Sequence, residues 1–202
     1  MKIGEIKREA LLLIFPEIEA RFNEESEKSV NEGIEALKCD PSVRSYLEAS
    51  VPSINRAICE IENAGASKTK RAIITVKNTK GAFDLQDRIP ELMRVLSIHQ
   101  NGKNVNYVEL DGFVLLEGAS AGEIEVVYKS RVEKIRYITE EAHELDLDFG
   151  VVALIPYFVA SELCETENGE RARELRARFF NGISSYSSKS TTQDEVEAIY
   201  SW

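Results

Sequence analysis

The sequence predicts an α+β fold with N-terminal helices, a central antiparallel β-meander and a C-terminal helical hairpin with a flexible tail. Three regions that differ in apolar periodicity predict it. Residues 1–65 place apolar side chains at helical spacing, residues 71–138 place them at strand spacing, and helical spacing returns in residues 149–183. We therefore expect a single α+β domain over residues 1–183 and a flexible C-terminal tail over residues 184–202.

The N-terminal region carries two apolar stripes that indicate amphipathic helices. The stripes consist of Ile3, Ile6, Ala10, Leu13 and Ile14, and of Ile54, Ala57, Ile58, Ile61 and Ala64. Asp40-Pro41 is a typical helix start, with a capping residue before a proline at the first helical position. Pro52 predicts either another helix start or a break, and Gly65 predicts a helix end.

The central region has the composition of strands joined by tight turns. Arg71–Lys77 is short and rich in β-branched residues, and Ile124, Val126 and Tyr128 alternate with polar neighbours. Such segments predict an antiparallel sheet of roughly four to six strands.

Two dipeptides predict the hairpin turns of this sheet. Asn101-Gly102 and Asp111-Gly112 both tolerate the positive φ angles that type I′ turns require. Pairing across the second turn places Leu110 opposite Phe113, and Val108 opposite Leu115, on one side of the sheet.

The C-terminal region reads as two helices joined by a polar turn at Asn168-Gly169. Pro156 lies in the first apolar run, where it either kinks the helix or marks its first turn. The second helix has one apolar face, formed by Ala172, Leu175, Phe179 and Ile183. We expect Ser184–Ser190 to be a flexible linker, because this Ser-rich stretch has no apolar periodicity.

The composition describes an acidic chain with enough apolar residues for a packed core. Of the 202 residues, 43% are hydrophobic and 30% are charged, and the formal net charge is −10. Since phosphate backbones are bound by clustered Lys and Arg, this balance disfavours a nucleic-acid-binding protein. No apolar run approaches the roughly 18–20 residues that cross a bilayer, so we expect no membrane association. Glu5 and Glu9 interrupt the N-terminal apolar run, which we interpret as an amphipathic helix of a cytosolic protein.

The sequence contains few residues with catalytic potential. Cys39, Cys59 and Cys164 form no CxxC pair, which indicates buried free thiols and neither a disulfide framework nor a zinc site. The acidic segment Thr139–Asp148 has the residue types of a metal site, including His143, but lacks the spacing of known zinc or calcium motifs. We expect a solvated loop whose Asp148 caps the next helix, and we expect no metal, no cofactor and no enzymatic activity.

The arginines near residues 171–178 permit two interpretations. Glu167–Arg171 and Glu174–Arg178 have the i,i+4 spacing of ion pairs, which favours a salt-bridged solvent face. Arginines at a subunit contact are the alternative. A second feature is the apolar cluster near the C-terminus, formed by Ile199, Tyr200 and Trp202. Exposed apolar side chains of this kind favour aggregation unless they dock on another surface. We therefore predict a partner or subunit interface made by Arg171, Arg178, Phe180, Ile199, Tyr200 and Trp202.

Two segments, together with the order of elements, resemble the head–tail connector (adaptor) proteins of tailed bacteriophages and prophages. The segments are VPSINRAICEIENAG at Val51–Gly65 and VVALIPYFVASELCETENGERARELRARFF at Val151–Phe180. The second contains the Ile155-Pro156-Tyr157 and Ser161-Glu162-Leu163 steps that resemble steps in this family. In its members from phages of Gram-positive hosts, a helical part like residues 1–65 precedes a β-rich insertion and a paired C-terminal helix.

The resemblance implies a non-enzymatic structural protein of the virion, made in the cytoplasm of the host bacterium. Such a subunit assembles into a homo-oligomeric ring, often twelvefold, under the portal protein and beside tail or other connector subunits. DNA passes through the ring as a non-specific passenger, and an acidic lumen would repel its backbone. Two other functions remain open: a metal-dependent hydrolase that uses the acidic loop around His143, and a small regulatory binding module.

Overall fold

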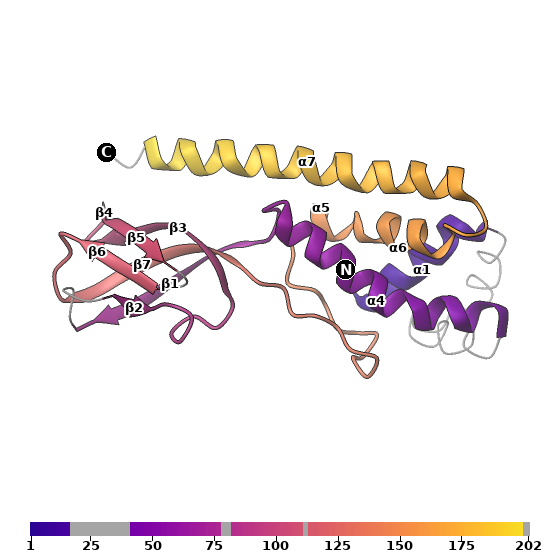
Figure 1. The fold of residues 1–202 in the computed structure, drawn as a ribbon, viewed down its shortest axis with the longest axis horizontal. Helices are drawn as coiled ribbons and strands as arrows, with labels where there is room; N and C mark the ends of the chain where they lie inside the picture. Colours follow the sequence, from indigo (N-terminus) through magenta and orange to yellow (C-terminus); the bar gives the residue numbers. More distant parts are fainter. Residues whose placement is uncertain (17–40, 78–81, 111–112, 200–202) are drawn as a thin grey trace. The chain divides into compact units, whose positions relative to one another are not determined.

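The computed structural model describes residues 1–16, 41–77, 82–110 and 113–199 (Figure 1). The fold is α+β, as predicted, with helices towards both ends of the chain and antiparallel strands between them. The chain divides into a helical unit, Met1–Ala66 with Glu133–Trp202, and a β unit, Ser67–Val132. The predicted β-rich insertion is therefore a compact unit in its own right.

Within the described residues, the N-terminal part of the helical unit contains α1, Ile3–Ile14, and α4, Pro41–Asn63. α4 begins at Pro41, as predicted, whereas the expected capping residue Asp40 lies outside the described residues. Pro52 lies inside α4 and marks neither a start nor a break. Val51 and Ile54, on either side of this proline, are buried, so tertiary packing offsets the hydrogen bond that proline cannot donate.

The buried face of α1 departs from the predicted stripe at its C-terminal end. The first three residues of that stripe are buried, as expected. Leu11 then packs against Val43 and Leu47 of α4. It is buried in place of the predicted Leu13 and Ile14, which are half-buried.

Gly65 ends α4 in the predicted way. Its φ angle is +69°, a left-handed conformation that glycine adopts without a steric cost. The Gly65 N–H donates to the Glu62 carbonyl, and the Ala66 N–H donates to the Ile61 carbonyl. These two bonds form a Schellman motif, which satisfies carbonyls that the helix leaves open.

The C-terminal part of the helical unit contains α5, Phe149–Val152, α6, Ile155–Leu163, and α7, Gly169–Ile199. Pro156 lies in the first turn of α6, which was one of its two predicted positions. The predicted apolar face of α7 is buried, and its Phe179 ring lies 4.8 Å from the Phe158 ring of α6.

The sequence predicts that this last helix ends at Ile183, and that boundary is wrong because α7 continues as one helix to Ile199. Serine hydroxyls along the helix satisfy backbone carbonyls: Ser184 bonds to Phe180 and Ser185 bonds to Asn181. Ser187 donates to the carbonyl of Ala64 at the end of α4, which adds a tertiary contact. Within the described residues, no helix combines the length and apolar character needed to span a membrane.

The β unit contains two antiparallel sheets whose inner side chains form one apolar core. The larger sheet has the order β1-β7-β3-β4 and the smaller has the order β2-β6-β5. Their bounds are β1 Thr69–Val76, β2 Phe83–Asp84, β3 Leu92–Gln100, β4 Lys103–Asn104, β5 Asn106–Leu110, β6 Phe113–Glu117 and β7 Gly122–Ser130. The antiparallel arrangement was predicted, but the order is more complex than a meander because the first strand pairs with the last. β7 ends at Ser130, so the strands stop short of the predicted limit at residue 138.

The predicted hairpins have the predicted register. Gln100 pairs with Lys103 across Asn101-Gly102, whose φ angles of +53° and +74° fit a type I′ turn. Leu110 pairs with Phe113, and Val108 with Leu115. The Asp111-Gly112 turn itself lies outside the described residues. The alternating apolar residues of β7 face the core, as expected.

Candidate interaction surfaces

The acidic segment Thr139–Asp148 covers the beginning of α1. The backbone carbonyls of Glu141 and His143 accept hydrogen bonds from the N–H groups of Gly4 and Ile3, at 2.9 and 3.0 Å. These N–H groups have no partner inside their own helix, so the segment supplies a cap. The Glu141 carboxylate also lies 2.7 Å from the Lys7 ammonium, and their side chains are 12% and 8% exposed. The segment therefore stabilises the fold through backbone and side-chain contacts.

Asp148 is the N-cap residue of α5, as predicted, but its side chain makes no capping hydrogen bond. Its backbone carbonyl accepts from the N–H groups of Val151 and Val152 instead. The carboxylate is exposed and remains available for another contact. No group of three His, Cys, Asp or Glu side chains within the described ranges is arranged to hold a metal ion.

We predict that zinc and manganese leave the melting temperature of the purified protein unchanged. A metal that binds the folded state raises the stability of the protein as the metal concentration increases. The Glu141 carboxylate already accepts a hydrogen bond from the Lys7 ammonium. Differential scanning fluorimetry with each metal, together with elemental analysis, checks this expectation. A stoichiometric transition metal, or a large thermal shift that Glu141→Gln abolishes, would contradict it.

Arg171, Arg176 and Arg178 of α7 form ion pairs, though not all with the predicted partners. Glu174 pairs with Arg178, as predicted, and also with Arg171, both at 2.7 Å. The predicted Glu167–Arg171 pair is wrong, because the Glu167 carboxylate accepts a hydrogen bond from the Tyr46 hydroxyl of α4. These contacts support the interpretation as a salt-bridged solvent face, and such exposed pairs contribute little stability.

The three predicted interface residues whose side chains the structure describes, Arg171, Arg178 and Phe180, do not gather on one surface. Arg171 and Arg178 are about two helical turns apart and share a face of α7. Phe180 is about two and a half turns from Arg171, so it lies on the opposite face. Its ring is 40% exposed and contacts the rings of Phe158 and Phe179. The side chain of Ile199, and all of Tyr200 and Trp202, lie outside the described residues.

The hydrogen bond from Tyr46 to Glu167 joins α4 to the turn before α7 and changes the acidity of the phenol. This hydrogen bond, with a smaller contribution from burial, raises the pKa of Tyr46 to about 12. The unfolded chain has an ordinary tyrosine pKa of about 10. The folded state therefore holds this proton more tightly than the unfolded state does.

We predict a loss of stability between about pH 10 and pH 12 that depends on Tyr46. The contribution of this tyrosine is fully present below pH 10 and disappears as the pH rises through its folded-state pKa. Urea denaturation of wild type and Tyr46→Phe across this interval measures it. The difference between the two proteins should shrink towards high pH, and a difference that stays constant would contradict the assignment. Tyr107, whose pKa is raised by burial, is present in both proteins and cancels.

Three exposed apolar side chains of the helical unit were not predicted from the sequence. Tyr137 and Ile138 are 72% and 86% exposed, and Phe149, the first residue of α5, is 78% exposed. Tyr137 and Ile138 lie at the tip of a turn that Arg136 and Thr139 close with two hydrogen bonds. Turn tips are usually Gly, Asn, Asp or Pro, so the apolar pair at this position was a usable signal.

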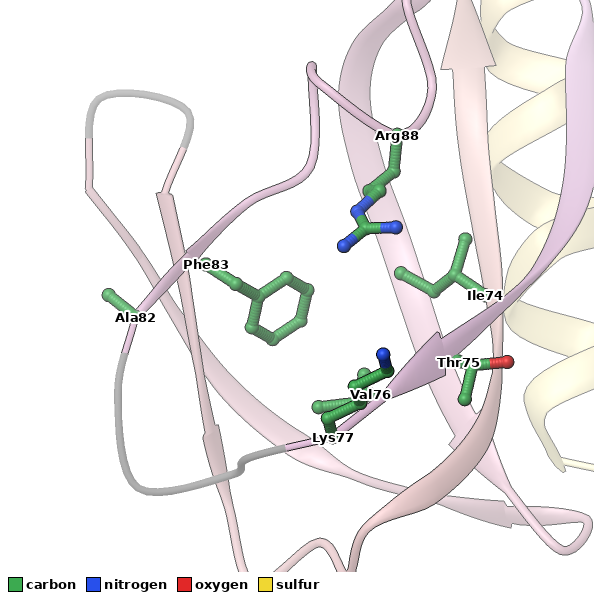
Figure 2. Close-up of a pocket in the computed structure, with 7 residues that line it drawn as sticks. All are labelled: Ile74, Thr75, Val76, Lys77, Ala82, Phe83 and Arg88. Atoms are coloured by element: carbon green, nitrogen blue, oxygen red, sulfur yellow. The ribbon is translucent and has the colours of Figure 1, made fainter.

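The β unit contains a hollow of about 260 Å³ next to the end of β1. Figure 2 shows the Arg88 guanidinium and the Lys77 ammonium approaching the hollow from opposite sides, with the Phe83 ring and Ile74 on its flanks. None of the seven lining residues is acidic; the others are Thr75, Val76 and Ala82. The site is therefore apolar with a cationic rim, although the chain as a whole is strongly acidic.

The two cysteines in the described part of the chain give no sign of a reactive centre. Cys59 and Cys164 are free thiols, and burial raises the pKa of Cys164, which disfavours the nucleophilic thiolate. Cys39 lies outside the described residues.

No family model matches this chain, and no curated protein sequence matches it. A function is therefore inferred from the residue pattern and the geometry described above.

Proposed function

We propose that this protein is a structural subunit of a bacteriophage or prophage virion, a head–tail connector that forms a ring under the portal. The observation that carries the proposal is the packing of the two segments that resemble this family. Val51–Gly65 and Val151–Phe180 are far apart in the sequence but belong to one packed helical unit. If the resemblance reflected only the apolar spacing of a single amphipathic helix, the two segments would not need to pack in the same unit.

Specific contacts join the two segments. The Arg56 guanidinium of α4 makes a bidentate ion pair with the Glu162 carboxylate of α6, with N–O distances of 2.7–2.9 Å. Glu162 belongs to the Ser161-Glu162-Leu163 step, and Arg56 belongs to the SINRAI part of the first segment. Such fork-to-fork pairs fix orientation as well as proximity. The residues that define the resemblance therefore include ones that hold α4 against α6.

The place of the β unit in the order of the chain also supports the proposal. The chain leaves the helical unit after Ala66 and returns to it at Glu133. This is the order that the resemblance implies: a helical part, a β-rich insertion and a paired C-terminal helix. The net charge of −10 suits a ring through which DNA must pass without adhering.

The contacts of the acidic segment weigh against the alternative of a metal-dependent hydrolase. Glu141 and His143 use their backbone carbonyls to cap α1, and the Glu141 carboxylate pairs with Lys7. The segment thus has a structural role that accounts for its acidic residues nearest α1.

We predict that the free protein is mainly monomeric and binds the portal protein encoded in the same genome. A subunit that joins an existing vertex must not assemble elsewhere, so its contacts with other copies should be weak in isolation. Sedimentation velocity should show a species near 22.7 kDa for the protein alone and co-sedimentation when portal rings are added. A stable large oligomer without portal would contradict the first part, and failure to bind the portal would contradict the second.

A further inference from the structure

We propose that neighbouring copies of this protein contact each other head to tail, with the α5 tip of one copy inserted into the cationic hollow of the next. The α5 tip consists of Asp148 and Phe149. The cationic hollow is the site in the β unit lined by Ile74, Lys77, Phe83, Arg88 and their three neighbours. This inference rests on the proposed ring and specifies which surfaces would form its subunit contact.

The hollow has the features of a site that receives an aromatic ring beside a carboxylate. Ile74, Val76 and Phe83 provide an apolar lining, and the Phe83 ring faces the interior of the hollow (Figure 2). The Lys77 and Arg88 side chains reach the same space, and in the described part of the chain neither makes an ion pair. An anion that entered the hollow would therefore meet both cations.

The α5 tip has the complementary chemistry. The Phe149 ring is 78% exposed, although it begins a helix whose next residues pack into the core. Asp148 precedes it directly, and its carboxylate is exposed and makes no capping bond. A phenylalanine ring on the apolar lining, with the carboxylate between Lys77 and Arg88, would therefore bury an exposed aromatic side chain and pair three charges.

Charge distinguishes this tip from the other exposed apolar side chains of the helical unit. Tyr137 and Ile138 have Lys134 and Arg136 before them and Glu140 and Glu141 after them, so charges of both signs accompany them. A turn of this kind offers no net attraction to a cationic rim. Phe149 instead follows Glu144, Asp146 and Asp148, which gives the tip the opposite sign to the hollow.

The proposed contact is asymmetric, and this has a consequence for assembly. The hollow belongs to the β unit and the tip belongs to the helical unit, so each copy can use both surfaces with two different neighbours. A contact of this kind generates a ring when its rotation closes. One aromatic anchor is small compared with a standard interface, so free copies should associate weakly. Copies held together on a portal would make the same contact at a high effective concentration.

The test is photo-cross-linking in the full chain. An unlabelled protein with p-benzoylphenylalanine in place of Phe149 is mixed with ¹⁵N-labelled wild-type protein at high concentration and irradiated. Mass spectrometry then identifies the joined peptides. We expect residue 149 to cross-link to labelled peptides that contain Ile74–Lys77 or Ala82–Arg88. Cross-links within one unlabelled chain, cross-links to another surface of the labelled chain, or no cross-link at all would each overturn the proposal.

Charge variants make the test specific. Arg88→Glu and, separately, Lys77→Glu in the labelled protein should lower the cross-linking yield by about tenfold, because each sets a carboxylate against Asp148. Lys103→Glu has the same charge change on β4 of the same unit and serves as the matched control. Asp148→Lys in the donor should restore cross-linking to the Arg88→Glu acceptor. Equal losses with all three acceptors, or no recovery with the reversed pair, would overturn the pairing. Because portal binding is measured separately, a protein that cross-links but ignores the portal would contradict the connector function alone.

Discussion

Replacing Phe179 with alanine is expected to lower the free energy of unfolding of the helical unit by about 3–5 kcal/mol. Phe179 is fully buried on the inner face of α7, and its ring lies 4.8 Å from the ring of Phe158. Its removal forfeits the burial of an aromatic side chain and leaves a cavity between α6 and α7. The loss is a large fraction of the 5–15 kcal/mol typical of a folded domain. Urea denaturation followed by circular dichroism at a helical wavelength measures it.

Phe180 provides the matched control for this experiment. It is the next residue, it has the same side chain and its ring is 40% exposed. Phe180→Ala should therefore cost about 1 kcal/mol, the value of its edge contacts with Phe158 and Phe179. If Phe180 belongs to the assembly surface, as the sequence predicts, the same change should weaken portal binding. Similar stability losses for the two variants would contradict the described packing of α7.

Lys7→Ala is expected to destabilise the protein by about 3 kcal/mol. The Lys7 ammonium and the Glu141 carboxylate are 2.7 Å apart, and both side chains are largely buried. Truncation of the lysine would leave the carboxylate in a poorly solvated position without this cation. The acidic segment would also hold the first turn of α1 less firmly, since Glu141 supplies one of its backbone caps.

The double variant Lys7→Met/Glu141→Leu separates the cost of an unpaired charge from the value of the pair. Replacing both partners by apolar residues of similar size should recover most of the stability that Lys7→Ala loses, because no charge remains to be buried. Arg44 and Glu48 form an exposed i,i+4 pair on α4, and Arg44→Ala should change stability by less than about 0.5 kcal/mol. A Lys7→Ala effect no larger than that of Arg44→Ala would contradict the burial of the first pair.

Local chemistry explains why much of the fold could be predicted. Asn101-Gly102 and Gly65 require positive φ angles, and both the turn and the helix end lie where glycine permits them. The pairing of Val108 with Leu115 follows from the length of the turn between them. The start of α4 at Pro41 follows from the fixed φ angle of proline. In each case the information lies within a few residues.

The errors in the predicted fold arise from contacts between distant residues. β1 pairs with β7, so Thr69 lies opposite Lys129, and no local pattern specifies that partner. The extension of α7 beyond Ile183 places Ser187 against the Ala64 carbonyl, 123 residues away in the sequence. Glu167 likewise accepts a hydrogen bond from Tyr46, 121 residues away in the sequence, and not from its predicted partner Arg171. The apolar periodicity of a segment carries no information about which distant residues its side chains will contact.

The candidate interaction surfaces were less predictable than the fold for the same reason. Arg171 and Phe180 are close in the sequence, yet the helix places them on opposite faces. Lys77 and Arg88 become neighbours only because β1 and the segment after β2 border one hollow. Phe149 directly precedes an apolar run, and nothing in the sequence distinguishes it from a core residue. Its exposure becomes evident only in the folded chain.

Electron microscopy of the purified protein mixed with its portal protein tests the connector assignment most directly. The proposal predicts rings of this protein that cap one end of each portal, with the same rotational symmetry or one compatible with it. Phe180→Ala, which should remain folded, tests in the same experiment whether the exposed ring on α7 contributes to capping. Portals that remain bare while the folded protein stays monomeric beside them would contradict the central claim.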